Sequence, residues 1–199
     1  MRCIYCDKEI EKQSLYSVFV CQDKLCVNCR NKLIIKHEYI EVNEFKVESF
    51  YDYDGMYRDL LLQYKECFDE ALAEVFSYKI SDYLAIKYFG YNVVFVPSSK
   101  DKLKQRGFNH LELMFKDLNL KKVDGLAIKT EMLQEGKNLK QRKQIIDNFI
   151  YTGEKLNKVL IIDDVITSGS SIYGVFRALK PYCRKIRAVA LANKKTLSF

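Results

Sequence analysis

Two sets of residues in this chain have the types and spacing to do chemistry, and the more informative set lies near the C-terminus. The apolar run from Val159 to Ile162 leads into Asp163 and Asp164, and after two more apolar residues comes a small polar run, Thr167, Ser168, Gly169, Ser170 and Ser171. Four unbroken aliphatic residues are typical of a central parallel strand that is covered on both faces. Ligands of open α/β sheets bind at the carboxyl ends of such strands. We therefore expect a ligand site at this strand's end.

The polar run has the composition of an anion-binding turn. It precedes a helical apolar pattern formed by Ile172, Val175, Phe176 and Leu179. Backbone N–H groups at the start of a helix converge on an anion, and the helix dipole adds partial positive charge. The lysine and spacing of a Walker A loop are absent, which argues against an ordinary nucleoside triphosphatase.

The acidic pair indicates what accompanies the phosphate. Asp163 and Asp164 would repel a phosphate, so their most economical use is to accept hydrogen bonds from neutral hydroxyl groups beside it. The vicinal hydroxyls of a ribose 5-phosphate fit this description. The alternatives are an acidic turn before a Ser-capped helix with no ligand, and the acidic pair of a receiver domain. A receiver domain needs a later phosphorylated Asp, and no acidic residue follows Ser171.

The second set consists of cysteines near the N-terminus. The pairs Cys3-x-x-Cys6 and Cys26-x-x-Cys29 have the spacing of zinc ribbons and fingers, and we predict a structural Zn²⁺ on these four thiolates. Cys21 and His37 remain rival ligands, and an iron–sulfur cluster is a less favoured alternative. The odd count of seven cysteines and the lack of a signal peptide argue against disulfides.

Charge and hydropathy limit the partners. The 199 residues contain 33 Lys and Arg against 26 Asp and Glu, a net charge of +7, with basic clusters at 100–106 and 137–143. Such clusters favour an anionic partner, a pyrophosphate or a nucleic-acid backbone, although a solvated face is the simpler reading of any single lysine. No apolar run approaches 18 residues, so we predict no membrane insertion and a cytoplasmic protein.

The remaining pattern predicts alternating strands and helices. We expect strands at 15–21, 47–53, 91–96, 126–129, 159–162 and 186–192, and helices at 27–35, 55–64, 72–88, 103–115 and 172–179. The strand at 47–53 alternates like an exposed one, and 131–148 is polar enough for a loop or exposed helix. The polar stretch 37–43 marks a boundary between a zinc module, 1–43, and an α/β domain, 44–199.

A second crossing from strand to helix suits a pyrophosphate site. Ser98, Ser99 and Lys100 follow the strand that ends at Pro97, and Arg106 lies on the next helix. Alternation of strands and helices with sites at the strand ends indicates a doubly wound α/β fold with a mainly parallel sheet.

Residues 159–171 resemble the 13-residue signature of the phosphoribosyltransferases that bind phosphoribosyl pyrophosphate (PRPP). Several features in one order resemble the ComF family, which serves DNA uptake in natural transformation. They are the cysteine pairs, the segments 50–55 and 64–65, the elements 96–97 and 106–109, and this signature. The resemblance covers nearly the whole chain. It is closest in the combination of four cysteines, Arg106-Gly107-Phe108-Asn109 and the PRPP signature, and it loosely places Gln134, Lys137 and Arg142 on family positions.

The resemblance implies a type I phosphoribosyltransferase fold, PRPP bound with Mg²⁺, and contact with single-stranded DNA and a helicase-like translocase. Asp163 and Asp164 would hold the ribose hydroxyls, 167–171 the 5-phosphate, and Ser98, Ser99, Lys100 and Arg106 the pyrophosphate. No residue identifies an acceptor, so enzymatic turnover is left open. The alternatives are a nucleic-acid-binding scaffold with a non-catalytic site and a salvage enzyme that acts on a nucleobase.

Overall fold

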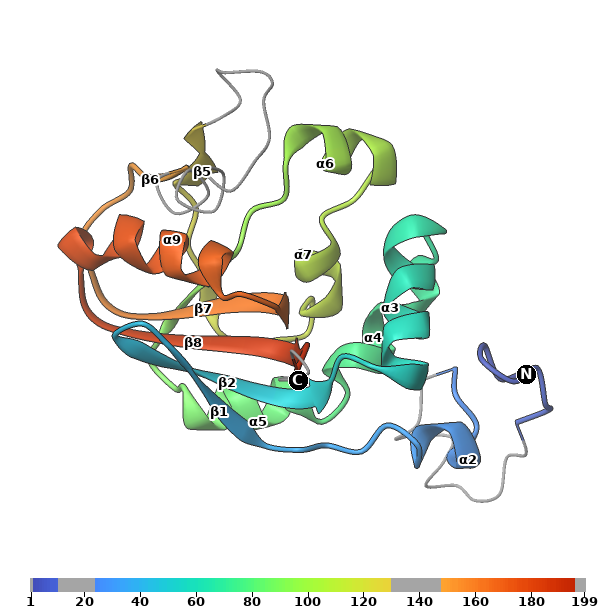
Figure 1. Cartoon of the computed structure of the whole chain (residues 1–199). Helices are drawn as coiled ribbons and strands as arrows, with labels where there is room; N and C mark the ends of the chain where they lie inside the picture. The colour runs from blue at the N-terminus through green and yellow to red at the C-terminus, as the bar shows by residue number, and fades with distance from the viewer. Residues whose placement is uncertain (1, 11–23, 130–147, 196–199) are drawn as a thin grey trace.

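A six-stranded sheet forms the centre of the molecule, with strand order β1-β2-β8-β7-β3-β4 (Figure 1). The computed structural model describes residues 2–10, 24–129 and 148–195. Five neighbouring strands are parallel and β1 is antiparallel to β2. The bounds are β1 Glu38–Val42, β2 Phe45–Asp52, β3 Asn92–Phe95, β4 Lys121–Lys122, β7 Leu156–Ile166 and β8 Cys183–Asn193. The predicted mixed α/β class with a mainly parallel sheet is confirmed.

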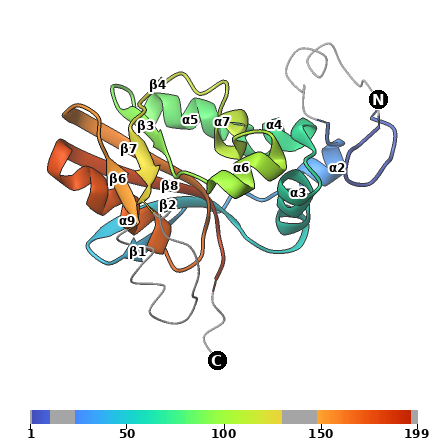
Figure 2. The same cartoon turned by 90° about the horizontal axis from the view of Figure 1, so that it is seen from above.

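The interior strands carry the core. The predicted run Val159 to Ile162 is fully buried, and Ala188 to Ala192 of the neighbouring β8 is almost fully buried. β1 and β4 lie at opposite edges of the sheet (Figure 2). Unbroken apolar runs are what a strand covered on both faces requires, so the sequence pattern and the position of β7 agree.

Helices cover both faces of the sheet and one of its ends. Helix α9 (Ser170–Leu179) lies on one face, and α5 (Ile80–Lys87) lies on the other (Figures 1 and 2). Helices α3 (Gly55–Glu66), α4 (Ala73–Ser77) and α7 (His110–Met114) lie beyond the carboxyl ends of the parallel strands, with α6 (Lys100–Arg106) above them. The candidate site is therefore enclosed by helices that follow three different strands.

Smaller elements complete the description. Strands β5 (Leu126–Ile128) and β6 (Phe149–Tyr151) pair with each other in a separate antiparallel sheet, and β6 packs on α9. The short helices are α2 (Val27–Arg30), η1 (Glu70–Leu72) and η3 (Lys180–Tyr182). The β6 strand was not predicted, and the helix expected at 27–35 is limited to the four residues of α2.

Two predicted helices are each interrupted. The helix expected at 72–88 divides into η1, α4 and α5, because Lys79 adopts a left-handed backbone with φ +60°. The helix expected around 103–115 divides at Gly107, φ +79°, and α7 begins anew at Asn109, whose side chain accepts a hydrogen bond from the N–H of Glu112. Apolar periodicity continues across both breaks, so periodicity alone did not reveal them.

Two strands differ from their predicted character. The stretch 47–53 was expected to be exposed, but β2 lies between β1 and β8 and buries both Glu48 and Ser49. The strand expected at 159–162 extends over Leu156–Ile166. The acidic pair therefore lies within the last residues of β7 that pair with β8, rather than after the strand. The position of the pair near the carboxyl end is unchanged by this extension.

Some predictions lie outside the described residues: the strand at 15–21, nearly all of 131–148, and Cys21, Gln134, Lys137 and Arg142. The stretch expected as a boundary at 37–43 is mostly strand β1, which pairs with β2. The division into two domains at residue 43 stays a prediction. Across the described ranges, no helix combines the length and apolar character that crossing a bilayer demands.

Candidate functional site

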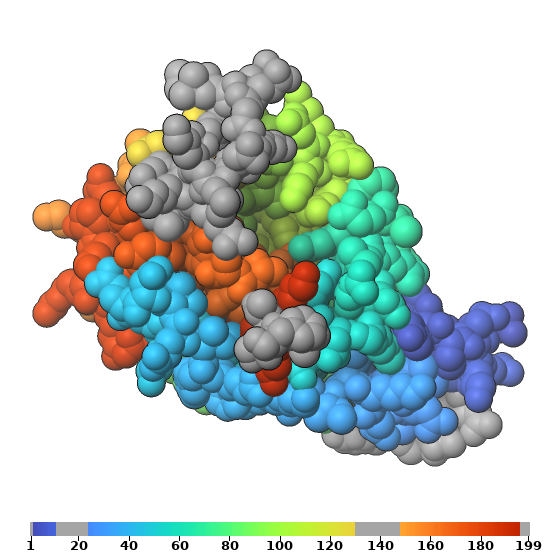
Figure 3. Space-filling view, in the orientation of Figure 1, coloured from blue at the N-terminus to red at the C-terminus, as the bar shows by residue number. Residues whose placement is uncertain are grey.

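The sheet brings the two predicted ligand segments together. β3 and β7 are parallel neighbours, and the N–H of Val96, just after β3, donates to the carbonyl of Ile162 at 3.0 Å. The segment that begins at Pro97 therefore leaves the sheet beside Asp163 and Asp164. The surfaces of α3, of residues 100–115 and of the segment around β7 meet on one face of the molecule (Figure 3).

Asp164 is a buried carboxylate with two basic partners. It is 5% exposed and forms an ion pair with Lys65 at the end of α3. Nε2 of His110, the first residue of α7, lies 2.7 Å from the same carboxylate. Burial opposes ionisation, but Lys65 and the hydrogen bond from His110 outweigh it and hold the pKa of Asp164 below its usual value. The carboxylate thus fastens α3 and α7 to the end of β7.

The partners of His110 determine which of its nitrogens carries the proton. Nδ1 of His110 lies 3.4 Å from Nη1 of Arg106 and 3.3 Å from the hydroxyl of Ser98. A guanidinium only donates, so Nδ1 accepts and Nε2 carries the hydrogen that points at Asp164. Burial lowers the pKa of His110, and the charges of Lys65 and Arg106 act in the same direction against Asp164. His110 is therefore a neutral donor in this site.

Asp163 is less fully supplied with donors. It is partly buried, and its Oδ1 accepts a hydrogen bond from the N–H of Asp164 at 2.9 Å. Among the described residues this is the one hydrogen-bond donor to its carboxylate. Burial and the adjacent Asp164 charge raise the pKa of Asp163, and Lys65 offsets this only in part. A cation or a pair of hydroxyl donors would relieve this deficit.

The polar loop after β7 enters helix α9 through a glycine. Gly169 has φ +72°, and a Cβ at this position would lie 2.8 Å from a methyl of Val42 on β1. The loop thus needs glycine both for its backbone conformation and for its close approach to β1. Thr167 and Ser168 are exposed. The hydroxyl of Ser168 lies 2.9 Å from that of Ser170 and accepts from its N–H at 3.4 Å.

The four residues predicted for pyrophosphate lie differently from one another. Ser98 contacts His110, whereas Ser99 caps α6 by accepting from the N–H of Lys102 at 3.5 Å. Lys100 is exposed at the start of α6. The Arg106 side chain is only 7% exposed and donates to the carbonyl of Lys65 at 3.1 Å. Arg106 is therefore a buried residue that contacts the backbone of Lys65 and the ring of His110, on the side of the ring away from Asp164.

Sequence reasoning missed the roles of Lys65 and His110. Lys65 was noted only as part of the family resemblance, and His110 follows directly after the Arg106-Gly107-Phe108-Asn109 element. A weak signal existed, because Lys65 is part of the segment 64–65 and His110 directly follows the element 106–109, both already singled out. The hydroxyl of Tyr64, next to Lys65, donates to the carbonyl of His110 at 2.8 Å and joins the two helices.

The predicted cysteine ligands come together. The sulfurs of Cys3, Cys6, Cys26 and Cys29 all lie within 4.8 Å of one another, and those of Cys6 and Cys26 are 3.7 Å apart. A tetrahedral site with Zn–S bonds of about 2.3 Å places its sulfurs about 3.8 Å apart. Burial opposes ionisation of Cys3, but backbone N–H groups of Cys26, Cys6 and Tyr5 outweigh it and lower the pKa of Cys3, whereas burial and the neighbouring sulfurs raise the pKa of Cys29. The cluster could hold a metal such as zinc.

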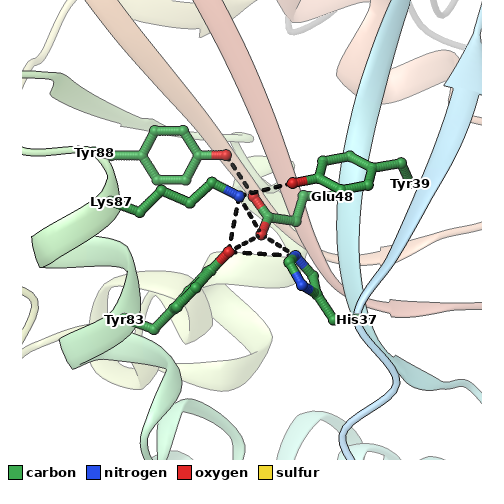
Figure 4. Close-up of polar contacts among 6 residues, drawn as sticks. All are labelled: His37, Tyr39, Glu48, Tyr83, Lys87 and Tyr88. Carbon is green, nitrogen blue, oxygen red and sulfur yellow. Dashed lines mark hydrogen bonds and ion pairs between the residues drawn. The ribbon is translucent and has the colours of Figure 1, made fainter.

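His37, the rival ligand, lies in a separate polar cluster. Its ring stacks on Phe50, and Nε2 contacts the carboxylate of Glu48, which is 1% exposed (Figure 4). The same carboxylate accepts from Lys87 at 2.8 Å, from Tyr83 at 2.7 Å and from Tyr88. Burial opposes ionisation, yet Lys87 and these hydroxyls lower the pKa of Glu48. His37 thus belongs to the packing of α5 on β2.

A basic residue is one of the contacts between the cysteine cluster and the rest of the chain, besides the burial of Cys3, Leu25 and Cys29 in the core. Nη1 of Arg30, at the end of α2, donates to the carbonyl of Val75 on α4 at 3.1 Å, and the guanidinium lies 4.6 Å from the ring centroid of Tyr78. Such a cation–π contact contributes about 0.5–1 kcal/mol at an exposed site. Arg30 therefore joins the cysteine segment to the helices beyond the sheet.

The architecture and site define an α/β protein with an acidic pair at a parallel strand end and a four-cysteine cluster. No protein-family model matches the chain. Over 181 residues the chain is 28% identical to Competence protein ComFC of Streptococcus pneumoniae (strain ATCC BAA-255 / R6), across 89% of this chain and 80% of that protein. This similarity supports the resemblance to the ComF family that the motifs indicated.

Proposed function

We propose that the chain is a PRPP-binding protein of the type I phosphoribosyltransferase class that acts in competence and DNA uptake, where it handles incoming single-stranded DNA in the cytoplasm. The observation that carries the PRPP site is the acidic pair near the end of β7, beside the end of β3, followed at once by the Gly169-capped start of α9. The role in competence rests on the similarity to ComFC. A helicase-like translocase is the expected protein partner.

The two acidic residues would have unequal roles. Asp164 is already held by Lys65 and His110, so it would orient the site and stabilise its charge. Asp163 keeps acceptor capacity and would take the ribose hydroxyls. The start of α9, with Thr167 and the serines of the loop, would bind the 5-phosphate.

The pyrophosphate would lie towards the segment after β3. Lys100 is the exposed cation of this segment, and Ser98 and Ser99 already bond to protein groups. Mg²⁺ would neutralise charge on the pyrophosphate and the departing oxygen when it is bound. A transfer reaction at carbon 1 of the ribose also needs an acceptor.

Calorimetric titration tests the PRPP site. PRPP is titrated with and without Mg²⁺ into the wild-type protein and into Asp163→Asn, and ribose 5-phosphate serves as the partial ligand. We expect magnesium-dependent binding of PRPP that weakens at least tenfold in Asp163→Asn, with weaker binding of ribose 5-phosphate. A folded wild-type protein that binds neither ligand would leave the nucleic-acid-binding scaffold as the function.

We further propose that the four cysteines bind one structural Zn²⁺. Metal analysis of the purified protein should give one zinc per chain, and Cys3→Ser should lower both the zinc content and the melting temperature. Cys183→Ser is the matched control, because this thiol lies on β8 outside the cluster. Full zinc content in Cys3→Ser would contradict the ligand set.

A further inference from the structure

The starts of β7 and β8 carry basic side chains at the opposite end of the sheet from the acidic pair. In Figure 1 both strands begin at the left and point towards α3 and α7. Lys155 precedes Asp163 by eight residues of mostly extended chain, about 26 Å at 3.3 Å per residue. The basic end is therefore separate from the proposed PRPP site. We call it the strand-start surface and define it by Lys155, Lys158, Tyr182, Arg184, Lys185 and Arg187.

The cations of this surface have no acidic partners among the residues that the structure describes. Elsewhere the exposed lysines are commonly paired, as in Lys46 with Glu41, Lys116 with Glu74 and Lys180 with Glu44. From residue 155 to the end of the chain the acidic residues are Asp163 and Asp164, which lie at the other end of β7. The side chains of Lys158, Lys185 and Arg187 lie on one face of the sheet and that of Arg184 on the other, so the cations surround this end of the two strands. The exposed Glu154, next to Lys155, is the one acidic residue adjacent to them in the sequence. Such net positive charge is the electrostatic footprint of a polyanion site.

The lysines are adjacent across the sheet. Lys158 of β7 and Lys185 of β8 are register partners, and their ammonium groups lie 5.6 Å and 6.0 Å from the ring centroid of Tyr91. The shared tyrosine keeps the two like charges together on one face. Phe89, in the same turn as Tyr91, is 84% exposed. An exposed aromatic residue therefore lies two positions before the tyrosine that both ammonium groups contact.

A cavity adjoins these cations. It has a volume of about 490 Å³, and its lining combines two cations with an aromatic ring, Lys155, Arg184 and Tyr182 among others. The ring of Tyr182 packs edge-on against Tyr151 at 5.2 Å and is 36% exposed. A base can stack on such a fixed, accessible ring while the cations bind the flanking phosphates.

We propose that the strand-start surface is where this protein binds single-stranded DNA, with the backbone on Lys155, Lys158, Arg184, Lys185 and Arg187 and a base against Tyr182. The choice of DNA as the polyanion rests on the proposed role in DNA uptake. The basic helix α6, with Lys102 and Lys104, is the rival surface. It lies near the acidic pair, so DNA there would occlude PRPP.

Fluorescence anisotropy with a labelled oligothymidylate separates the two surfaces. Lys155→Gln/Lys185→Gln should weaken binding about tenfold and make the slope of log K against log salt shallower by about 1.4, at about 0.7 per lost phosphate contact. The matched control, Lys102→Gln/Lys104→Gln, removes two exposed lysines from α6 and should change little. Tyr182→Ala should weaken binding roughly fivefold or more, whereas Tyr182→Phe keeps the ring and the affinity.

The outcomes separate this inference from the proposed PRPP site. Titration of PRPP with Mg²⁺ into Lys155→Gln/Lys185→Gln should match the wild type, because the two sites lie at opposite ends of β7. Loss of oligothymidylate binding in the α6 variant alone, equal loss in both variants, or no binding by the wild-type protein would overturn the inference whatever the PRPP result.

Discussion

Glu48 and Asp164 are both buried carboxylates held by a lysine and a histidine, yet they stand in different surroundings. Glu48 lies in the middle of β2 and accepts from two tyrosine hydroxyls as well as from Lys87 and His37 (Figure 4). Asp164 lies near the end of β7 and next to a second carboxylate that has one donor among the described residues. A buried carboxylate whose hydrogen-bonding capacity is filled by protein donors, such as Glu48, stabilises the fold. A pair of carboxylates with few protein donors, such as Asp163 and Asp164, has capacity left to bind a ligand.

The largest expected effect is on stability, at the saturated cluster. Glu48→Gln should lower the free energy of unfolding by about 3 kcal/mol, the low end for a broken buried pair, because Lys87 loses its buried counter-charge while its own side chain is 31% exposed. Denaturation in urea measures this. The control is Glu41→Gln on β1, whose exposed ion pair with Lys46 should contribute less than about 1 kcal/mol. Equal losses in the two variants would show that Glu48 is no anchor.

The next effect is expected at the acidic pair and divides between stability and binding. Asp164→Asn should cost about 1–3 kcal/mol, because Lys65 and His110 lose a charged acceptor while the repulsion on Asp163 disappears. Urea denaturation and PRPP titration of the same preparation measure both quantities. Binding of PRPP should fall at least tenfold even where the variant is fully folded; unchanged binding would make Asp164 a second anchor.

The two clusters should respond to pH with opposite signs. The pKa of Glu48 is lowered by folding, so its contribution to stability is present at neutral pH and is lost as the pH falls below its usual value of about 4. The pKa of Asp163 is raised, so the folded state holds this proton more tightly and stability declines as the pH rises above that value. The free energy of unfolding of Asp163→Asn, minus that of the wild type, should therefore increase as the pH rises from 5 to 8. Urea denaturation across this range checks the sign, and a variant that loses stability would contradict it.

The smallest effect on stability is expected for Arg106, which contacts His110. Arg106→Gln removes a positive charge that disfavours the imidazolium, so the pKa of His110 should rise, and stability should fall by about 1 kcal/mol from the lost hydrogen bonds. Nitrogen-15 NMR of the imidazole reports both the pKa and which nitrogen carries the proton. A pKa that does not rise would mean that Arg106 does not act on His110.

The sequence predicts those features whose residues are close together in the chain. The strand through Asp163, the helix from Ser170 and the cysteine spacing are local patterns, and the structure agrees with each. The partners of Asp164 come from α3 and α7, about 100 and 54 residues earlier in the chain, and nothing local in the sequence connects them.

The burial of Glu48 was not predicted, although the strand that contains it was. Alternation in 47–53 indicates a strand, but it does not reveal that Glu48 and Ser49 would both be buried, or that Glu48 would lie under α5. A signal was available on the helix, since Tyr83 and Lys87 are four residues apart and share one face of α5. Polar residues on a helix face that is otherwise apolar predict a buried acceptor opposite them.

Titration of PRPP with Mg²⁺ into Asp163→Asn/Asp164→Asn and into Glu48→Gln, side by side with the wild type, tests the central claim most directly. We expect Glu48→Gln to bind as the wild type does under conditions where it is folded, and the double variant to lose binding while remaining folded. Binding retained by the double variant, or lost equally in Glu48→Gln while that protein is folded, would contradict the assignment of the ligand site to the end of β7.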